Sequence, residues 1–196
     1  MKNTPLKFCL LILLTLTFCS KDSSKEQVQD EEVNNYEFED LGSDAPYLYG
    51  QSYYGRNAYT TYYPGNIPII LSIPHGGDIT PSEISNRTYG VTVTDSNTIE
   101  LGMAISNYLF SNYNIRPHVV INNLKRTKLD ANRDKTEAAQ GNIFAERAFD
   151  EFHYYISSAR DEIIKNFNTG LLFDICLLYT SPSPRDLSTS RMPSSA

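Results

Sequence analysis

Three short apolar runs constrain the fold of this chain more than any other feature. They cover residues 67–73, 118–121 and 171–175. Such nearly continuous runs are typical of strands that are buried on both faces of a sheet. Two amphipathic stretches separate them, from about 95 to 112 and from about 136 to 167. The order strand, helix, strand, helix, strand predicts an α/β fold with a mostly parallel or mixed sheet flanked by helices.

Both amphipathic stretches place apolar residues at the spacing of one helix face. In the first, Leu101, Ile105 and Leu109 recur every four residues after Asp95 and Ser96, a pair that suits a helix start. The second repeats apolar residues at spacings of three and four: Phe149, Phe152, Ile156, Ala159 and Ile163. We therefore expect each stretch to pack these side chains against the sheet.

The N-terminal residues resemble an export signal. Lys2 and Lys7 accompany an apolar run over residues 8–18, shorter than the about 20 residues that a membrane-spanning helix needs. The Leu-Thr-Phe sequence before Cys19 resembles a bacterial lipobox, in which this cysteine would be acylated; a simple signal peptide is the alternative. We expect residues 1–19 to be a signal peptide with a lipobox. The protein would then be an exported bacterial membrane lipoprotein, periplasmic or at the cell surface.

Composition and charge describe the rest of the chain. Residues 20–45 are polar and acidic, which predicts a disordered tether because they bury too little apolar surface to fold.

The body at 46–175 contains no cysteine and therefore no disulfide framework. The net charge is −6 without a long basic run, which excludes a sequence-independent nucleic-acid grip. Tyrosines gather between 47 and 63, and they suit either strand packing or a wall that contacts sugars or peptides.

Candidate metal ligands follow the first apolar run. A Pro-His-Gly-Gly-Asp sequence occupies residues 74–78 and places His75 at the rim of the expected sheet, where ligands bind in such folds. Imidazole and carboxylate both suit zinc, so His75 with Asp78 or Asp95 is a candidate metal site. The alternatives are a loop histidine for His75, a turn residue for Asp78 and a helix N-cap for Asp95.

A basic segment follows the second apolar run. Residues 125–134 contain four cations within ten positions. Arg126 and Arg133 can each bind a carboxylate through two parallel hydrogen bonds, and Asn132 adds a donor. In an acidic protein this segment is a candidate anion site, and a solvated loop with local salt bridges is the alternative.

Taken in order, three segments resemble the N-formylglutamate amidohydrolase family, and the third also resembles zinc carboxypeptidases and related deacylases. The segments are residues 68–77 with their Pro-His-Gly-Gly sequence, Asp95 followed by Thr98, and residues 126–133 with an Arg…Asp-x-Asn-Arg pattern. The resemblance covers about residues 45–175. It implies a phosphorylase/hydrolase-like α/β fold in which 46–175 is the N-terminal part of an amidohydrolase domain.

The resemblance implies a zinc cofactor. His75 would be one ligand and Asp78 or Asp95 the carboxylate ligand, with the His-x-x-Asp spacing favouring Asp78. Zinc would lower the pKa of a bound water so that hydroxide attacks an amide, and a glutamate base would take the proton.

The resemblance also implies a substrate. Arg126 would be catalytic by polarising the scissile carbonyl, while Asn132 and Arg133 would bind the substrate carboxylate. The expected partner is a small N-acyl amino acid or peptide. The alternative function is that of a surface lipoprotein that binds peptides or glycans through its tyrosine-rich region without catalysis.

The composition changes abruptly after Ile175. In the family the third strand runs into Asp-x-His-x-His, which supplies the last zinc ligand, whereas here Cys176 follows. Residues 176–196 contain many Ser, Pro and Arg residues and resemble translated adapter read-through; a natural disordered tail is the alternative. We therefore expect a non-native tail on a truncated domain that has lost its third ligand and its activity.

Overall fold

The structure is a computed structural model that describes residues 36–177. The chain divides into two units, and the first contributes only residues 36–38, which form no helix or strand. The second unit begins at Glu39 and contains all the elements below. The expected signal peptide, the Cys19 lipidation site and the tail from 178 onward lie outside the described residues. Within the described part, no helix combines the length and apolar character required to cross a membrane.

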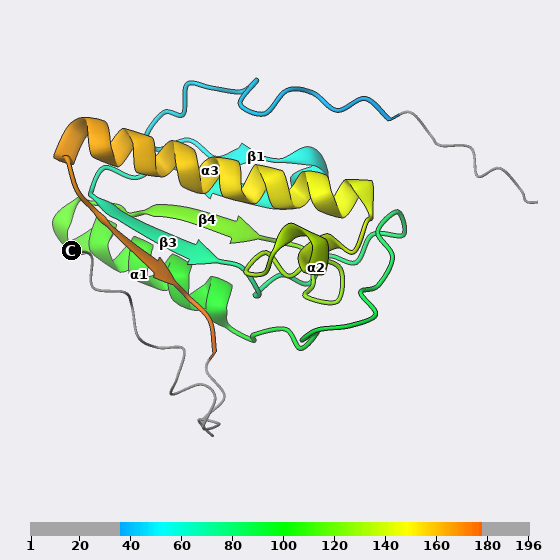
Figure 1. Cartoon of the computed structure of the whole chain (residues 1–196). Coiled ribbons are helices and arrows are strands. Elements are labelled where there is room, and N and C mark those ends of the chain that lie inside the picture. Colours follow the sequence, from blue (N-terminus) through cyan, green and yellow to red (C-terminus); the bar gives the residue numbers. More distant parts are fainter. Residues whose placement is uncertain (1–35, 178–196) are drawn as a thin grey trace, which may run out of the picture. The chain divides into compact units, whose positions relative to one another are not determined.

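The second unit is built on a five-stranded mixed sheet with the order β1-β2-β4-β3-β5 (Figure 1). The strands are β1 (Tyr53–Tyr54), β2 (Thr60–Tyr63), β3 (Ile69–Ile73), β4 (His118–Asn122) and β5 (Leu171–Asp174). β3 lies parallel to both β4 and β5, whereas β2 runs antiparallel to β1 and β4. The α/β class and the mixed sheet are confirmed, and each of the three apolar runs contains a strand.

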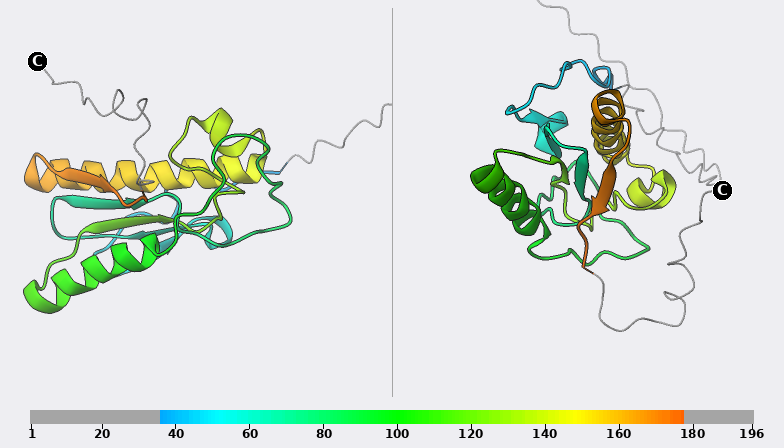
Figure 2. Two further views of the ribbon diagram at one scale, coloured as in Figure 1. Left: turned by 90° about the horizontal axis from the view of Figure 1, so that it is seen from below. Right: turned by 90° about the vertical axis from the view of Figure 1, so that its left-hand side faces the viewer.

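Helices cover both faces of this sheet. They are α1 (Thr98–Tyr113), α2 (Lys135–Ala139) and α3 (Ile143–Phe167), with a short 3-10 turn, η1 (Arg56–Ala58), between β1 and β2. α1 lies on one face and α3 on the other (Figure 2). The single helix expected from 136 to 167 is in fact two, because Gln140 and Gly141 both adopt positive φ, 51° and 80°.

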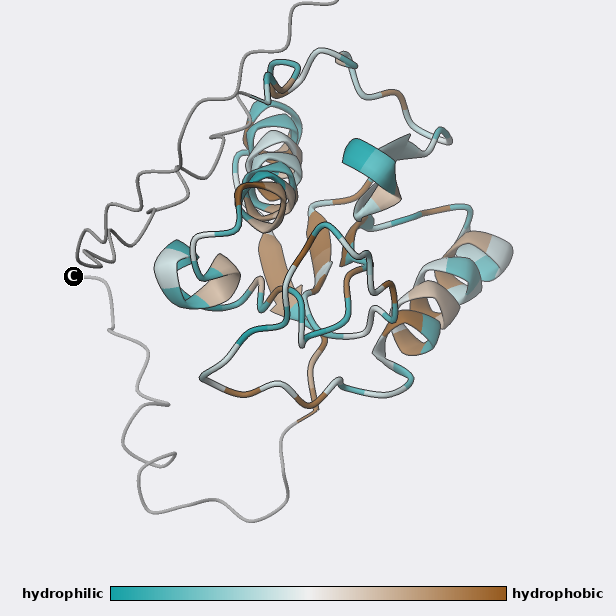
Figure 3. Ribbon diagram, turned by 90° about the vertical axis from the view of Figure 1, so that its right-hand side faces the viewer, coloured by the Kyte–Doolittle hydropathy of each residue, from teal (hydrophilic) through white to brown (hydrophobic). Residues whose placement is uncertain are grey.

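Alternating side chains of β3 divide the core into two layers. Ile70 belongs to the larger cluster, which packs under α3, whereas Leu71 and Ile73 belong to the smaller cluster under α1. This two-residue alternation is the normal consequence of strand geometry. The strands therefore appear as an apolar layer between more polar helices (Figure 3).

The buried face of α1 only partly matches the expected one: Ile105 packs against the smaller cluster as expected, but Leu101 does not. Leu101 is 52% exposed, while the buried residues of the helix are Thr98, Gly102 and Ser106. These small residues recur every four positions and allow the helix to approach the sheet closely. A Cβ on Gly102 would lie 2.4 Å from Cδ1 of Ile73. The expected face is therefore offset from the buried one, because small residues that permit close packing lie deepest.

The tyrosine-rich segment supplies core packing. The ring of Tyr62 is 1% exposed and lies within 5.2–6.5 Å, centroid to centroid, of the rings of Tyr47, Tyr53, Tyr155 and His118. The Tyr62 hydroxyl also lies 2.9 Å from Nδ1 of buried His118. This favours the packing interpretation of the segment over an exposed wall that contacts ligands.

The expected third strand forms, but it is not buried. All four residues of β5 are exposed, because β5 is an edge strand and no described strand pairs with its outer side. Its other side pairs with β3, so the end of β5 still lies beside the end of β3.

Candidate functional site

Three side chains meet at the C-terminal end of the parallel strands. His75 follows β3 by two residues, Asp130 lies in the loop after β4, and Asp95 lies just before α1. The backbone N–H of Asp95 donates to the carbonyl of His75 at 3.0 Å, which brings the end of the long intervening loop back to the strand. The structure thus places the site where open α/β sheets bind ligands.

The ring of His75 faces a carboxylate on each side. Its Nε2 lies 2.7 Å from Oδ1 of Asp130, and its Nδ1 lies 3.4 Å from Oδ2 of Asp95. His75 is buried, and Nδ1 has no hydrogen-bond partner in the described structure. Buried polar atoms are rarely left without a partner, so this nitrogen marks a position where a ligand is expected.

Asp130 is the centre of the hydrogen-bond network. It is fully buried and accepts hydrogen bonds from Nε of Arg126 at 2.9 Å and from the backbone N–H of Asn132 at 3.2 Å. Burial raises its pKa, but the hydrogen bond and charge of His75 and the charge of Arg126 outweigh this and lower the pKa to about 2. Because an ionised carboxylate only accepts, Nε2 of His75 must carry the proton, and in the neutral ring Nδ1 then presents its lone pair.

Arg126 connects the two aspartates. Its Nη1 lies 3.5 Å from Oδ1 of Asp95, while its Nε binds Asp130. The guanidinium is almost fully buried at 7% exposure. An arginine held by two buried carboxylates keeps a fixed orientation, because its planar fork fits carboxylate oxygens well.

Arg87 completes the site, and sequence reasoning missed it. Its Nη1 donates to the carbonyl oxygens of Val91 at 2.7 Å and of Arg126 at 3.1 Å, and it lies 3.8 Å from Oδ2 of Asp130. The side chain is 1% exposed, and burial lowers its pKa. In the sequence it is a single arginine in a polar loop, a context that indicates a solvated residue. No local signal distinguishes it.

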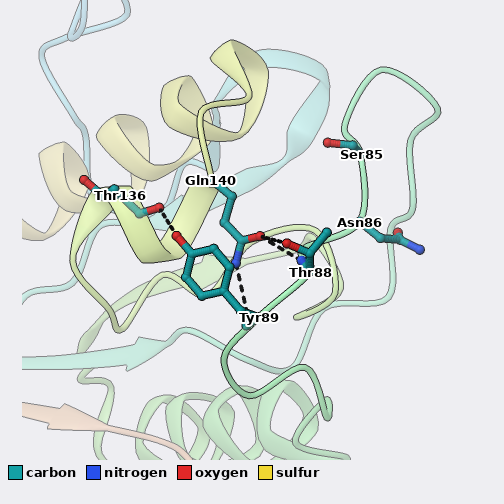
Figure 4. Close-up of a pocket in the computed structure, with 6 residues that line it drawn as sticks. All are labelled: Ser85, Asn86, Thr88, Tyr89, Thr136 and Gln140. Carbon is teal, nitrogen blue, oxygen red and sulfur yellow. Dashed lines mark hydrogen bonds between the residues drawn. The ribbon is translucent and has the colours of Figure 1, made fainter.

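A hydrogen-bonded clasp holds the Arg87 loop against α2 (Figure 4). Oε1 of Gln140 accepts from the backbone N–H of Thr88 at 2.7 Å, and its Nε2 donates to the carbonyl of Tyr89 at 2.9 Å. The Tyr89 hydroxyl donates to the carbonyl of Thr136. These residues line a polar pocket of about 240 Å³. The clasp fixes the two residues that follow Arg87 and so helps to hold its guanidinium near Asp130.

The two glycines after His75 are explained by close packing. β3 and β4 resume contact beyond the histidine through parallel bridges between Gly77 and Lys125 and between Ile79 and Leu124. A Cβ on Gly77 would lie 2.2 Å from the backbone of Asn123. Any larger residue at this position would therefore push the two strand extensions apart.

The structure brings together only some of the residues expected at the site. Asp78 is exposed, and no described hydrogen bond or ion pair joins it to His75. Asn132 and Arg133 are also exposed and line a neighbouring pocket of about 430 Å³ with His153. Nε of Arg133 lies 4.0 Å from Oδ2 of Asp130, so this pocket borders the buried network.

The buried pair fits part of a zinc site. Two ligands about 2.1 Å from a tetrahedral zinc ion lie about 3.4 Å apart, which matches the separation of His75 Nδ1 and Asp95 Oδ2. Within residues 36–177, no group of three or more His, Cys, Asp or Glu side chains is arranged to hold a metal. The described residues therefore offer two of the three protein ligands that catalytic zinc normally has.

The chain that follows β5 reaches the same place. The backbone N–H of Leu177 donates to Oδ2 of Asp95 at 3.0 Å. Burial and the charges of Asp174 and Asp95 raise the pKa of the Cys176 thiol.

No family model, no curated protein and no solved structure matches this chain. Any functional conclusion therefore depends on the geometry of the site and on the resemblance of its motifs.

Proposed function

We propose that this chain is part of a zinc-dependent amidohydrolase, similar to N-formylglutamate amidohydrolases, that hydrolyses the amide of an N-acyl amino acid or small peptide. The observation that carries the proposal is the placement of the two ring nitrogens of His75. One nitrogen binds an ionised Asp130, and the other faces Asp95 without a hydrogen bond. A carboxylate that fixes the tautomer and orientation of a histidine is typical of metal-binding imidazoles.

The choice between the two candidate aspartates follows from burial and distance. We propose Asp95, and not Asp78, as the carboxylate ligand, because Asp95 is buried beside Nδ1 whereas Asp78 is exposed. The His-x-x-Asp spacing that favoured Asp78 assumes that the chain turns back within three residues. The bridge at Gly77 instead continues the strand direction and carries Asp78 away.

Zinc, when bound, would supply a water of lowered pKa for attack on the amide. Asp130 would hold His75 in the required tautomer and hold Arg126 in position through its Nε. Nη2 of Arg126 has no hydrogen-bond partner among the described residues, and it is the atom that we expect to contact the scissile carbonyl oxygen. Asn132 and Arg133 are exposed in the adjoining pocket, where they can bind a substrate carboxylate.

The proposal includes the expectation that the printed chain is inactive. It supplies neither a third ligand nor a placed general base among residues 36–177. We expect export as a lipoprotein, which argues for an extracellular N-acyl amino acid or peptide. Non-catalytic binding through the tyrosine-rich region has less support, because Tyr59 and Tyr62 are buried in the core.

The decisive experiment is zinc titration of the chain, labelled with ¹⁵N, followed through the ring nitrogens of His75. We expect the Nδ1 resonance to shift on zinc addition while Nε2 stays protonated and bound to Asp130. Magnesium at the same concentration is the control, because it prefers oxygen ligands. An unchanged His75 ring at saturating zinc would refute the metal site.

Activity is measured separately. We expect no release of formate from N-formylglutamate by the printed chain. Turnover would contradict the expected lack of activity but not the hydrolase assignment. In contrast, a longer chain from the same locus that lacks a histidine after Asp174 would favour a non-catalytic binding protein.

A further inference from the structure

The carboxylate of Glu137 lies between two arginines without a hydrogen bond to either. Its Oε1 is 3.9 Å from Nη2 of Arg87 and 3.7 Å from Nε of Arg133. Both separations exceed the about 2.7–3.2 Å of an N–H···O hydrogen bond. The side chain is 38% exposed, which leaves it room to change rotamer. A movement of about 1 Å toward either guanidinium would complete a charge-assisted hydrogen bond.

The guanidinium of Arg87 has one donor to spare. Its Nε donates to the carbonyl oxygen of Glu137 at 3.3 Å, and its Nη1 donates to the carbonyl oxygens of Val91 and Arg126. Its Nη2 is buried and has no hydrogen-bond partner in the described part of the chain. A buried charged donor without a partner is costly, so Nη2 would gain from an acceptor. The carboxylate of Glu137 is the acceptor that we expect it to take.

The backbone around this gap is held in place, so only the Glu137 side chain has to move. The carbonyl oxygen of Glu137 accepts hydrogen bonds from Nε of Arg87 and, at 3.4 Å, from Nε2 of Gln140. Gly90 lies against the gap, because a Cβ at this position would be 2.7 Å from both Nη2 of Arg87 and Oε1 of Glu137. A larger residue would fill the space, whereas glycine leaves it open.

The other arginine lies in the pocket where the proposed function places the substrate carboxylate. Arg133 is 45% exposed and lines this pocket together with Asn132 and Glu137. A carboxylate that binds a guanidinium through two parallel hydrogen bonds neutralises its charge. Such a ligand on Arg133 would compete with Glu137 for the same partner and would repel it as a like charge.

We propose that Glu137 is a positioning residue that couples binding of the substrate carboxylate at Arg133 to the buried network around Asp130. The inference rests on the proposed function, which assigns the substrate carboxylate to Arg133. The ligand replaces Glu137 as the counter-charge of Arg133, and Glu137 then accepts a hydrogen bond from Nη2 of Arg87. Nη1 of the same guanidinium lies 3.8 Å from Oδ2 of Asp130, so the new bond also fixes the charge that faces the carboxylate of the His75 pair.

The test follows the side-chain ¹⁵N signals of Arg87 and Arg133 in the full chain while acetate is added without zinc. Sodium chloride at the same ionic strength controls for charge screening. We expect the Arg133 signals to report acetate binding. The Nη2 hydrogens of Arg87 should then exchange with solvent about tenfold more slowly, as expected for one new hydrogen bond between charged groups.

Two variants separate the coupling from binding itself. Glu137→Asp keeps the charge but withdraws the carboxylate by one methylene, so it no longer reaches Arg87. Glu137→Gln removes the charge that acetate would repel. Both variants should still bind acetate at Arg133, whereas the slower exchange at Arg87 should be lost. Asp134→Asn is the matched control, because Asp134 lines the same pocket but forms no described ion pair with Arg87, and it should keep the response.

The possible outcomes distinguish this inference from the proposed function. Acetate binding at Arg133 without a change at Arg87 would overturn the coupling and leave the substrate-binding role of Arg133 intact. No response at either arginine would overturn both. A response that Glu137→Asp preserves would also overturn the coupling, as would full protection of Nη2 before acetate is added, because that atom would then already have a partner. The metal site is tested independently, by the zinc titration of His75.

Discussion

Nε2 of His75 lies 2.7 Å from Oδ1 of Asp130, and both side chains are buried. This contact joins the end of β3 to the loop after β4, and it also sets which ring nitrogen would be available to the proposed metal. Because Asp130 simultaneously faces the guanidinium groups of Arg126 and Arg87, its charge supports both the proposed chemistry and the fold.

Replacing Asp130 with Asn should therefore affect both properties. The amide keeps the shape of the side chain but leaves the buried charges of Arg126 and Arg87 without their main counter-charge. Breaking a buried ion pair in this way costs about 3–5 kcal/mol in the free energy of unfolding. Zinc affinity should fall by about 10–100-fold in folded protein. Urea unfolding and zinc titration measure these effects. Asp134→Asn, in the same loop but exposed, is the control and should change neither.

Asp95 and Asp78 provide a direct comparison of the two candidate ligands. Asp95→Asn should abolish the zinc-dependent shift of His75 Nδ1, because Asp95 is the carboxylate at 3.4 Å from that atom. Asp78→Asn should leave zinc binding unchanged, because Asp78 is exposed away from the buried network. The reverse result would restore the His-x-x-Asp interpretation of the sequence.

The contact between α1 and β3 predicts an unfavourable effect of Gly102→Ala. Its new Cβ would meet Cδ1 of Ile73, which is fully buried and cannot move away easily. Overpacking of this kind costs about 1–3 kcal/mol, partly offset by about 1 kcal/mol from the better helix propensity of Ala. Adding Ile73→Val removes the clashing methyl group and should recover part of the loss. If the two changes are simply additive in denaturant unfolding, the proposed contact is not responsible.

Buried His118 predicts a pH-dependent stability. Burial lowers its pKa from 6.5 to about 4, partly opposed by the charge of Glu162. Between these two values the unfolded chain binds the proton and the folded chain does not. The contribution is therefore present above about pH 6.5 and is lost as the pH falls toward 4. A shift of this size corresponds to ~3 kcal/mol in the free energy of unfolding.

The measurement is urea unfolding from pH 7.5 to 4.5. His118→Asn keeps a hydrogen-bonding group near the Tyr62 hydroxyl but cannot be protonated, so its unfolding free energy should depend less on pH over this range. His153→Asn is the comparison variant; burial also lowers the pKa of His153, so this variant should reduce the pH dependence less than His118→Asn does. Identical pH profiles for His118→Asn and the unchanged chain would show that His118 is not the group responsible.

Three of the five described strands were the most predictable part of the fold, whereas β1 and β2 in the tyrosine-rich segment were not predicted. Nearly continuous apolar runs fixed β3 and β4 to within two residues, because full burial on both faces leaves few polar positions. The helices were less predictable. The break at Gln140 depends on two backbone angles, and the buried face of α1 depends on how closely Gly102 approaches Ile73. Neither property is encoded in apolar periodicity.

The sequence predicted which residues form the site, but not which of them contact one another. The motifs indicated His75, Asp95 and Arg126, all of which the structure brings together. Spacing favoured Asp78 because three residues is a short distance along the chain, but distance in space is set by the long loop that returns Asp95 to the strand end. Arg87 was not anticipated because its burial arises only from tertiary contacts.

The bridges that reunite β3 and β4 beyond His75 have a consequence for how the site would respond to a metal. The histidine stands at an interruption in the pairing and not at its end, so it is anchored both before and after the interruption. Binding or removal of a metal ion should therefore shift side-chain atoms and leave the backbone conformation unchanged. The cost of positioning the proposed metal ligands would then be met during folding, before any ion binds.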